Sequence, residues 1–423
     1  MPRIVRNTLL NYIPTGFAIE QAINPLRIFE LNKKPIRNGE IIYLCEREIR
    51  VKDNFALQFA LQKSEELNLP LKIIHPKINY NYQQKQEFID NQIEQVKTLF
   101  RNIGLDFEII EKTPHEIIKN MNPAILIIDF NPILKRDYLK NADFKIYEID
   151  GHNIIPARFV SSKQEYSAAT LRTKIYHNIY PFLTEFMNLT SDKIEADLVL
   201  EDFIKNKLQY YSETKNNPSA EVTSGLSKYL NLGFIASQRI ALEVIRSGVK
   251  DINKEAFLEE LIIRKELADN FCLYSESFKD FSSIQNWAKI SLNNHRLDIR
   301  PYLYSLQDLE NAKTHDKLWN ATQTQLVKEG IIHGYLRMYW AKKILEWMST
   351  ADEALKVAIY LNDKFAYDAP SANGYVGILW AIGGLHDRAF ADYPVTGKIR
   401  RMTYDSMKRK YDLSNYIKKY TKI

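Results

Sequence analysis

Residues 124–129 read AILIID, a short apolar run rich in β-branched isoleucine, which is typical of a β-strand. Four similar runs lie elsewhere in the first 150 residues: IIYLC (41–45), LKIIH (71–75), FEII (107–110) and FKIYEI (144–149). Between them, residues 53–68 and 84–100 place apolar side chains at intervals of three and four, which predicts amphipathic helices. This alternation predicts a parallel sheet with helices on both of its faces.

The second half of the chain has a different pattern. From about residue 200 the strand-like runs disappear, and long amphipathic segments occur at 255–271, 321–348 and 351–366. This half is therefore expected to be almost entirely helical, and a chain of 423 residues is long enough for two domains. Neither a G-x-G-x-x-G motif nor a Walker phosphate loop accompanies the expected sheet.

The composition is that of a globular protein, with 45 % hydrophobic and 26 % charged residues. Cys45 and Cys272 are the only cysteines and the eight histidines are scattered, so we expect no disulfide framework and no metal site. No signal peptide or membrane-spanning run is apparent, which favours a cytoplasmic, monomeric protein that does not enter membranes. The net charge of +6 weakly favours a polyanionic partner.

A candidate phosphate site lies in residues 210–233. Hydroxyl groups of Thr223, Ser224 and Ser227 flank Gly225 just before an apolar helix is expected to begin. Free backbone N–H groups and the positive end of the helix dipole would favour a phosphate there. Ordinary capping of the helix by serine and threonine explains the same pattern and is the more common case.

Three further segments carry polar side chains whose role the sequence leaves open. Glu259 and Glu260 lie beside basic residues, a spacing that usually means surface ion pairs but also suits a carboxylate in a cleft. Residues 360–390 combine polar side chains with a glycine-rich turn, which fits a ligand-binding loop or an ordinary structural one. Residues 398–422 carry nine lysines or arginines against two aspartates, so this tail either contacts a phosphate backbone or is a solvated helix.

The segment GYLRMYWAKKILEW at 334–347 holds two of the five tryptophans. Trp340 and Trp347 are two helical turns apart and therefore share one helix face. Aromatic residues at this spacing usually fill a core, and that interpretation is preferred for the segment taken alone.

Five long passages carry a resemblance to a known family. They are RVKDNFALQFAL (50–61), YEIDGHNIIPARFVSSKQEYSA (147–168), FLEELIIRKELADNFCLY (257–274), LWNATQTQLVKEGIIHGYLRMYWAKKILEW (318–347), and the interrupted passage AIYLNDKFAYD (358–368), NGYVGILWAIGGLHDRAF (373–390) and GKIRRM (397–402). They resemble the class II cyclobutane pyrimidine dimer photolyases of the photolyase/cryptochrome superfamily, which are light-driven flavoenzymes. The resemblance implies a Rossmann-like α/β domain at 1–180, with an N-terminal extension at 1–38, and a connector at 181–215. An all-α domain that binds FAD and DNA would follow at 216–423.

The cofactor implied by the resemblance is FAD, active as FADH⁻. Six residues fall where the family contacts the phosphates and ribose: Tyr211, Lys215, Thr223, Ser224, Leu226 and Ser227. Near the isoalloxazine ring, Asn362 falls beside flavin N5, and Asn373 is a weaker candidate. Arg337 and Asp368 match a salt bridge beside the ring, and an antenna chromophore of the deazaflavin or folate type is a further expectation.

The resemblance also assigns the lesion and electron-transfer residues. Glu260, Met338 and Trp380 match the dimer pocket and, with Asn362, are the candidate catalytic residues. Their chemistry suits an acid that hydrogen-bonds a thymine, a polarizable sulfur and a stacking indole. The tryptophans Trp340, Trp319 and Trp347 match an electron-transfer chain, with Trp340 next to FAD and Trp347 outermost.

The remaining assignments concern DNA. Phe390 stands where the family usually has a tryptophan that enters the gap left by the flipped dimer. Four basic residues are expected to contact DNA with it: Lys398, Arg400, Arg401 and Lys408. Lys215 stands where arginine is more common, which keeps the charge but loses the planar fork.

The function implied is light-driven repair of ultraviolet-damaged DNA by a carbon–carbon lyase. The pyrimidine dimer flips out of the duplex, accepts one electron from excited FADH⁻, splits, and returns the electron. A cryptochrome-like blue-light receptor without repair activity is the alternative, and a light-independent nucleic-acid-binding protein is a third. The presence of Glu260, Met338 and Trp380 favours repair over the receptor.

Overall fold

The structure is a computed structural model that describes residues 8–14, 16–20, 22–186 and 188–421. The chain folds into two compact units, each built from segments that are distant in sequence. The first unit comprises residues 1–163, 169–209 and 224–270, and the second comprises 164–168, 210–223 and 271–423.

A six-stranded sheet with the order β2-β7-β6-β3-β4-β5 forms the centre of the first unit. Five strands correspond to the five predicted runs: β3 (Glu40–Leu44), β4 (Leu71–Pro76), β5 (Phe107–Ile110), β6 (Pro123–Asp129) and β7 (Lys145–Ile149). These five pair in parallel, so the predicted parallel sheet is confirmed. The sixth strand, β2 (Ile28–Glu30), pairs antiparallel with β7. It was not predicted, because three residues are too few to show a strand pattern. A separate two-stranded parallel sheet joins β1 (Ile19–Glu20) to β8 (Glu185–Phe186).

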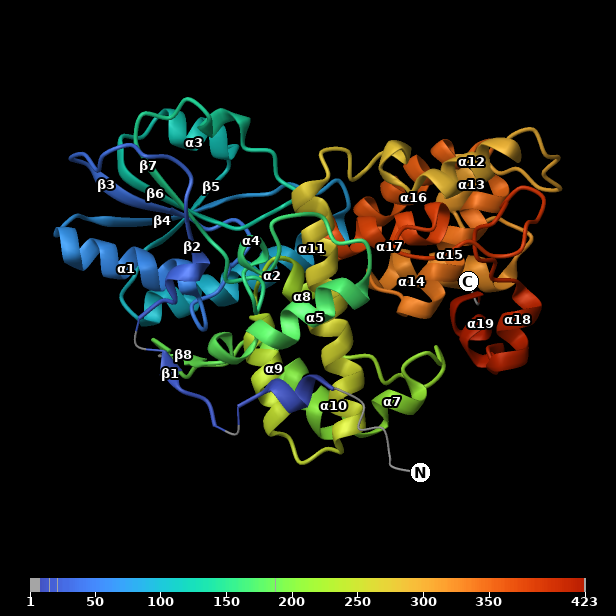
Figure 1. Cartoon of the computed structure of the whole chain (residues 1–423), viewed down its shortest axis with the longest axis horizontal. Coiled ribbons are helices and arrows are strands. Elements are labelled where there is room, and N and C mark those ends of the chain that lie inside the picture. Colours follow the sequence, from blue (N-terminus) through green and yellow to red (C-terminus); the bar gives the residue numbers. More distant parts are fainter. Residues whose placement is uncertain (1–7, 15, 21, 187, 422–423) are drawn as a thin grey trace. The chain divides into compact units, whose positions relative to one another are not determined.

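The helices up to residue 274 are α1 (Phe55–Leu67), α2 (Gln83–Asn102), α3 (Pro114–Lys119), α4 (Ala157–Val160), α5 (Ala168–Asn178), α6 (Glu195–Asp202), α7 (Tyr211–Thr214), α8 (Ser227–Asn231), α9 (Ser237–Arg246), α10 (Asp251–Leu258) and α11 (Lys265–Tyr274). Ile42 and Leu44 of β3 lie in one buried cluster with Ile117 and Ile118 of α3. On the other face, α1 packs against β3, β4 and β6. Figure 1 shows α3 and α1 on opposite sides of the fan of strands, so helices cover both faces as predicted.

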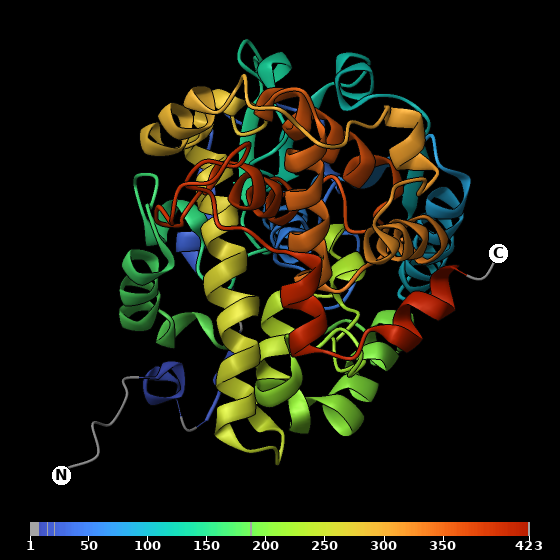
Figure 2. The ribbon, with the colours of Figure 1, turned by 90° about the vertical axis from the view of Figure 1, so that its right-hand side faces the viewer.

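A π-helical turn at Glu259–Arg264 joins α10 to α11. Residues 251–274 therefore form one long helix, yellow in Figure 2, which confirms the helix predicted over 255–271. The wide turn was not predicted, and Glu260 lies on it. Such turns are rare in helices and frequently occur at functional sites.

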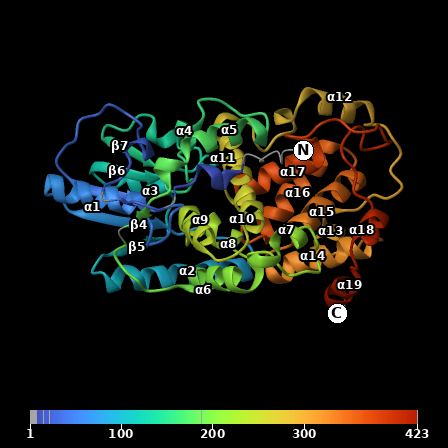
Figure 3. The same cartoon turned by 60° about the horizontal axis from the view of Figure 1, so that its bottom comes forward.

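The second unit is helical, as expected from the sequence. Its principal helices are α12 (Asn286–Asn294), α13 (Leu306–Glu310), α14 (Lys317–Glu329), α15 (Gly334–Trp347), α16 (Ala351–Phe365), α17 (Ala372–Gly383), α18 (Tyr404–Lys410) and α19 (Ser414–Thr421). Helix α15 packs against α14, α16 and α17, and α14 also packs against α19 (Figure 3). Leu336, Ile344 and Leu345 of α15 are buried, so this helix lies at the centre of the unit.

The single helix predicted over 321–348 is wrong, because the structure has two helices there. Gly330 ends α14 in the left-handed region, with φ +66°, and its N–H donates to the carbonyl of Leu326 at 3.0 Å. A Cβ atom on Gly330 would lie 2.1 Å from the ring of Tyr367. Glycine therefore both permits the left-handed turn and leaves room for this aromatic ring.

Residues 224–270 pack with the sheet in the first unit. The compact units therefore differ from the segments 1–180, 181–215 and 216–423 expected from the sequence. Those boundaries stay a prediction about domains that fold as separate units.

Candidate functional site

Three indoles form a continuous contact chain in the second unit. The ring of Trp319, on α14, lies parallel to that of Trp340 on α15, with 6.4 Å between ring centroids and 2° between ring planes. The same Trp319 ring meets Trp347 edge-on, at 5.4 Å and 70°. Trp319 is thus the middle member of the three, and the short distances suit electron transfer between neighbouring rings.

The N–H groups of two of these indoles are fixed by buried acceptors. Trp319 Nε1 donates to the carbonyl of Trp340 at 3.0 Å, and Trp340 Nε1 donates to Oε1 of Gln323 at 2.9 Å. All three tryptophans are buried, so they contribute to the core as well. Gln323 was not singled out from the sequence, because a glutamine on an amphipathic helix usually faces solvent.

A buried carboxylate lies at the start of α14, next to the middle indole. Asp316 accepts hydrogen bonds from the backbone N–H groups of Leu318 and Trp319, both at 3.0 Å, and caps the helix. The Tyr339 hydroxyl also donates to Asp316. Burial, followed by the charge of Asp316, raises the pKa of the Tyr339 phenol.

The ion pair expected beside the flavin ring forms between α15 and the segment after α16. Arg337 reaches Asp368 through three hydrogen bonds of 3.1, 3.2 and 3.1 Å. Arg337 Nη1 also lies 3.4 Å from Oδ1 of Asn362, a residue that is 2 % exposed. These three residues therefore form one polar group, and their assignment to the flavin ring stays a prediction.

A glycine on α17, Gly374, lets the backbone of that helix approach Asn362 closely. A Cβ atom on Gly374 would lie 3.0 Å from Asn362 Nδ2 and 3.2 Å from Ser371 Oγ. Asn362 Nδ2 donates to Asp363 at 3.1 Å, which fixes the amide orientation. The buried amide, the guanidinium and the glycine cradle fit a planar polar ring such as isoalloxazine. Asn373, in contrast, is exposed on the same helix.

The residues assigned to the FAD phosphates are divided between the two units. Tyr211 and Lys215 belong to the second unit, where the Lys215 ammonium lies 5.9 Å from the centroid of the Tyr211 ring. Thr223 is exposed in the second unit, while Ser224, Leu226 and Ser227 belong to the first. Ser224 Oγ accepts from the backbone N–H of Leu226 at 3.3 Å, and the Leu226 side chain is buried. The Ser224 hydroxyl is thus used locally, by the N–H of the residue that precedes α8.

The lesion residues lie on three different elements. Met338 and Trp380 are half-buried on the adjacent helices α15 and α17 of the second unit. Glu260 is exposed on the π-helical turn of the first unit. A buried lysine that the sequence did not single out, Lys342, places its ammonium 4.5 Å from the Trp380 ring centroid.

Charged and aromatic side chains alternate in the loop after α17. Arg400 pairs with Asp387 through two hydrogen bonds of 3.1 and 3.2 Å. Its guanidinium carbon also lies 4.4 Å from the centroid of the Phe390 ring and 5.8 Å from that of Trp380. Phe390 and Arg400 are thus brought together as expected. Lys398, Arg401 and Lys408 are exposed, with Arg401 over the Tyr393 ring at 4.7 Å.

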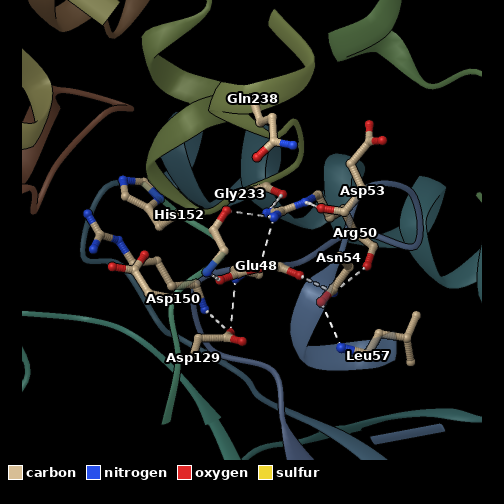
Figure 4. Close-up of polar contacts among 12 residues, drawn as sticks. Glu48, Arg50, Asp53, Asn54, Leu57, Asp129, Asp150, His152, Gly233 and Gln238 are labelled. Atoms are coloured by element: carbon tan, nitrogen blue, oxygen red, sulfur yellow. Dashed lines mark hydrogen bonds and ion pairs between the residues drawn. The ribbon is translucent and has the colours of Figure 1, made fainter. Parts of the chain in front are cut away.

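A buried polar network in the first unit was not found from the sequence (Figure 4). Asp129 Oδ2 accepts the backbone N–H groups of Glu46, Arg47 and Glu48 at 2.8 to 3.0 Å. Glu48 pairs with Arg50 at 2.8 Å, and burial raises the pKa of Glu48 to about 7. The network joins the end of β6, through Asp129, to the loop that follows β3.

In the part of the chain that the structure describes, no three His, Cys, Asp or Glu side chains are grouped so that they could hold a metal ion. Within those described ranges, no helix is both long and apolar enough to span a bilayer.

The fold is similar to two solved structures. One is a bacterial class III photolyase from Agrobacterium tumefaciens, with a TM-score of 0.68 and 14 % identity over 92 % of this chain and 87 % of that one. The other is a cryptochrome from Synechocystis, with a TM-score of 0.69 and 13 % identity over 92 % of this chain and 89 % of that one. At such identities the likeness shows the fold, and it confirms the expected photolyase/cryptochrome architecture.

Several curated proteins have a higher sequence identity to this chain than these two structures do. The chain is 35 % identical to the deoxyribodipyrimidine photo-lyase of Potorous tridactylus, over 92 % of this chain and 85 % of that protein. It is 34 % identical to the enzyme of the same name from Arabidopsis thaliana, over 90 % of this chain and 88 % of that protein. It is 30 % identical to the one from Methanothermobacter thermautotrophicus, over 93 % of this chain and 98 % of that protein. No family model matches the chain. The long matches to these proteins confirm the resemblance found in the sequence, and the chain belongs to the deoxyribodipyrimidine photo-lyase family.

Proposed function

We propose that this chain splits cyclobutane pyrimidine dimers in ultraviolet-damaged DNA, using light and a reduced flavin. Family membership supports the reaction. The observation that carries the proposal is the unbroken contact of Trp340, Trp319 and Trp347, because a packed core does not require three indoles in one ordered series.

The cofactor in this proposal is FAD, held with its ring beside Arg337, Asp368 and Asn362. When bound and reduced, FAD supplies the light-driven transfer of one electron to the dimer. The Arg337 guanidinium would stabilise negative charge on the reduced ring, and Asp368 fixes that guanidinium through three hydrogen bonds. Asn362 offers an amide whose orientation is set by Asp363. Tyr211, Lys215, Thr223, Ser224, Leu226 and Ser227 are proposed to hold the phosphates and ribose.

The dimer is proposed to lie against Met338 and Trp380, with Glu260 hydrogen-bonded to a pyrimidine. A half-buried indole can stack on a base, and a thioether packs softly against it. A carboxyl group can donate a hydrogen bond to a carbonyl oxygen that gains charge when the dimer accepts an electron. These residues bind and orient the lesion, and the bond cleavage itself needs no protein nucleophile.

The tryptophan chain is proposed to restore the reduced cofactor. In this role Trp340 gives an electron inward, Trp319 refills Trp340, and Trp347 refills Trp319. Burial of all three rings keeps water away from the oxidised indoles. An antenna chromophore, of the deazaflavin or folate type, is a further proposal, as is a monomeric protein in a reducing compartment.

DNA is proposed to contact the loop after α17 and the basic C-terminal segment. Phe390, braced by Arg400, would enter the gap that the flipped dimer leaves. Lys398, Arg401 and Lys408 are exposed and would contact phosphates.

The decisive experiment compares blue light with darkness. Chemically reduced protein is mixed with DNA that contains thymine dimers, and recovery of thymine absorbance is followed. Recovery in light alone supports the proposal. Two neighbouring substitutions test the role of Glu260 in the same assay. Glu260→Gln should lower the repair yield, whereas Glu259→Gln, which removes a partner of Arg172, should not. A yellow, photoreducible protein that leaves dimers intact would instead point to a light receptor.

A further inference from the structure

Trp380 differs from the three relay tryptophans in its charged neighbours. The Lys342 ammonium lies 4.5 Å from the Trp380 ring centroid, and the Arg400 guanidinium lies 5.8 Å from it. Among the residues that the structure describes, no lysine or arginine lies over the rings of the relay tryptophans, which are Trp319, Trp340 and Trp347. The backbone N–H of Trp319, in contrast, donates to the Asp316 carboxylate at 3.0 Å.

Lys342 is placed to act on Trp380 from inside the protein. It lies on α15, one turn beyond Met338, and is 2 % exposed. Its Nζ donates to the carbonyl of Ala381 on α17 at 2.9 Å. No carboxylate in the described part of the chain forms an ion pair with it. Keeping an ammonium here is costly, because one carbonyl and an aromatic face replace its hydration.

The charges around an indole change how easily it loses an electron. Oxidation leaves a positive charge on the ring, so a neighbouring ammonium disfavours oxidation and a neighbouring carboxylate favours it. The effect is strong in a buried site, because little water screens the charges. Among the described residues, cations face the ring of Trp380 and none faces the ring of Trp319, so the two indoles differ in the positive charge that opposes their oxidation.

We propose that Lys342 raises the one-electron oxidation potential of Trp380, so that this indole stacks on the dimer without joining the electron relay. The inference rests on the proposed function, in which Trp380 is the platform for the lesion. In the side reaction that Lys342 disfavours, one electron would leave the Trp380 ring for the photoexcited oxidised flavin and a cation radical would remain in the lesion pocket. Electrons then come from Trp340, and Trp380 stays intact.

The charge on Lys342 also gives a pH signature. Burial is the main cause that lowers the pKa of Lys342 to about 7. The carboxylates of Asp387 and Glu346 favour the ammonium and raise the pKa, whereas the positive charge of Arg400 lowers it. Below this pKa the ammonium is present, and above it the amine is neutral. Protection of Trp380 is therefore expected to weaken as the pH rises through about 7.

The test oxidises tryptophan without light. Azide radicals, which remove single electrons from indoles, are generated by pulse radiolysis in the flavin-loaded protein. Oxidised tryptophans are then located by peptide mass spectrometry. Trp287, half-buried and with its N–H bonded to Gln285, is the internal reference. Lys342→Met should increase oxidation of Trp380 relative to Trp287 several-fold, and Lys342→Arg should not.

The neighbouring lysine is the matched control. Lys343 pairs with Glu346 at 2.7 Å, and its ammonium lies over Tyr339, so Lys343→Met should leave Trp380 oxidation unchanged. The unaltered protein at pH 6 and pH 8.5 provides a second measurement if Lys342→Met does not fold, with more Trp380 oxidation expected at the higher pH. Equal Trp380 oxidation in folded Lys342→Met and the unaltered chain, or across the two pH values, would overturn the inference. Repair is assayed separately, so absence of repair with intact protection of Trp380 would count against the proposed function alone.

Discussion

The indole rings of Trp319 and Trp340 are stacked, with 2° between the ring planes and 6.4 Å between the ring centroids. The two residues come from different helices, α14 and α15, and the N–H of the first bonds the backbone carbonyl of the second. This double link fixes the distance between the rings. Trp347, although on the same helix as Trp340, contacts Trp319, so the order of the proposed relay depends on packing between α14 and α15.

Replacing the middle indole should interrupt the relay. Trp319→Phe is expected to lose most light-driven reduction of oxidised flavin, followed by flavin absorbance, and to repair normally after chemical reduction. The smaller ring leaves a cavity and should lower the free energy of unfolding by about 1–3 kcal/mol. Trp287→Phe, a tryptophan outside the relay, is the control and should photoreduce normally. Equal photoreduction by the two variants would exclude Trp319 from the path.

Breaking the ion pair at the proposed flavin ring should release cofactor. Arg337→Ala leaves the largely buried Asp368 carboxylate without its three hydrogen bonds and is expected to destabilise the fold by about 1–3 kcal/mol. The ratio of flavin to protein absorbance after purification should fall. Lys364→Ala removes a comparable pair with Glu310 and should leave that ratio unchanged. A full complement of flavin in Arg337→Ala would contradict the proposed site.

Two glycines on α17 offer a matched comparison. Gly374→Ala places a methyl group 3.0 Å from Asn362 Nδ2, so the amide must shift. Gly377→Ala meets nothing within 4 Å. The second change should stabilise the helix by about 0.5–1 kcal/mol, whereas the first should gain little or lose stability. Only Gly374→Ala should alter the flavin absorbance spectrum. Identical spectra in both would mean that Asn362 does not contact the ring.

Glu266 and Glu48 should contribute stability that is lost as the pH rises from about 4.5 to 8, whereas His75, His152 and His333, whose pKa values burial lowers, contribute in the opposite direction. Burial raises the pKa of Glu266 to about 8 and that of Glu48 to about 7, from a usual value of 4.5. At these two carboxyl groups the folded state therefore holds protons that the unfolded state has released, so their contribution to stability falls as the pH rises through this window. Urea denaturation at several pH values measures the effect. Glu266→Gln keeps an oxygen for the backbone N–H of Ile154 and should remove the Glu266 contribution from the profile. Glu108→Gln, at an exposed site, should not.

The loop after α17 should distinguish stacking from charge. Phe390→Trp enlarges the stacking surface and should tighten binding to dimer-containing DNA, whereas Phe390→Ala should cost about 1–3 kcal/mol of binding free energy. Lys398→Ala removes an exposed charge and should weaken binding to damaged and undamaged DNA equally. Titration of both DNAs at two salt concentrations makes this comparison. Equal affinities of Phe390→Trp and Phe390→Ala for damaged DNA would remove Phe390 from the interface.

Much of the fold could be predicted because local patterns and tertiary structure agree. The run at 124–129 is continuous and β-branched, as a strand buried on both faces must be, and it forms the fully buried β6. The break at Gly330 was missed because the apolar periodicity continues on both sides of it. Gly330 ends α14 in the left-handed conformation, and the close approach of the Tyr367 ring, which no local pattern reports, excludes a larger residue there.

The site was predicted in part, and the resemblance supplied most of it. Residues with distinctive chemistry, such as Trp319 and Arg337, could be carried over by position. Gln323 and Lys342 could not be found, because amides and ammonium groups on amphipathic helices usually face water. Long-range packing buries both of them, and no local pattern reports that.

The absence of a side chain at Gly330 limits which mutations this position can accept. The Tyr367 ring occupies the space that any larger residue would need, and Tyr367 immediately precedes Asp368, the partner of Arg337. A codon change that replaces this glycine would press on the ring and, through the backbone, on the electrostatics of the flavin. Substitution at this codon is therefore expected to lower the melting temperature and, through Asp368, to disturb the proposed flavin site at the same time.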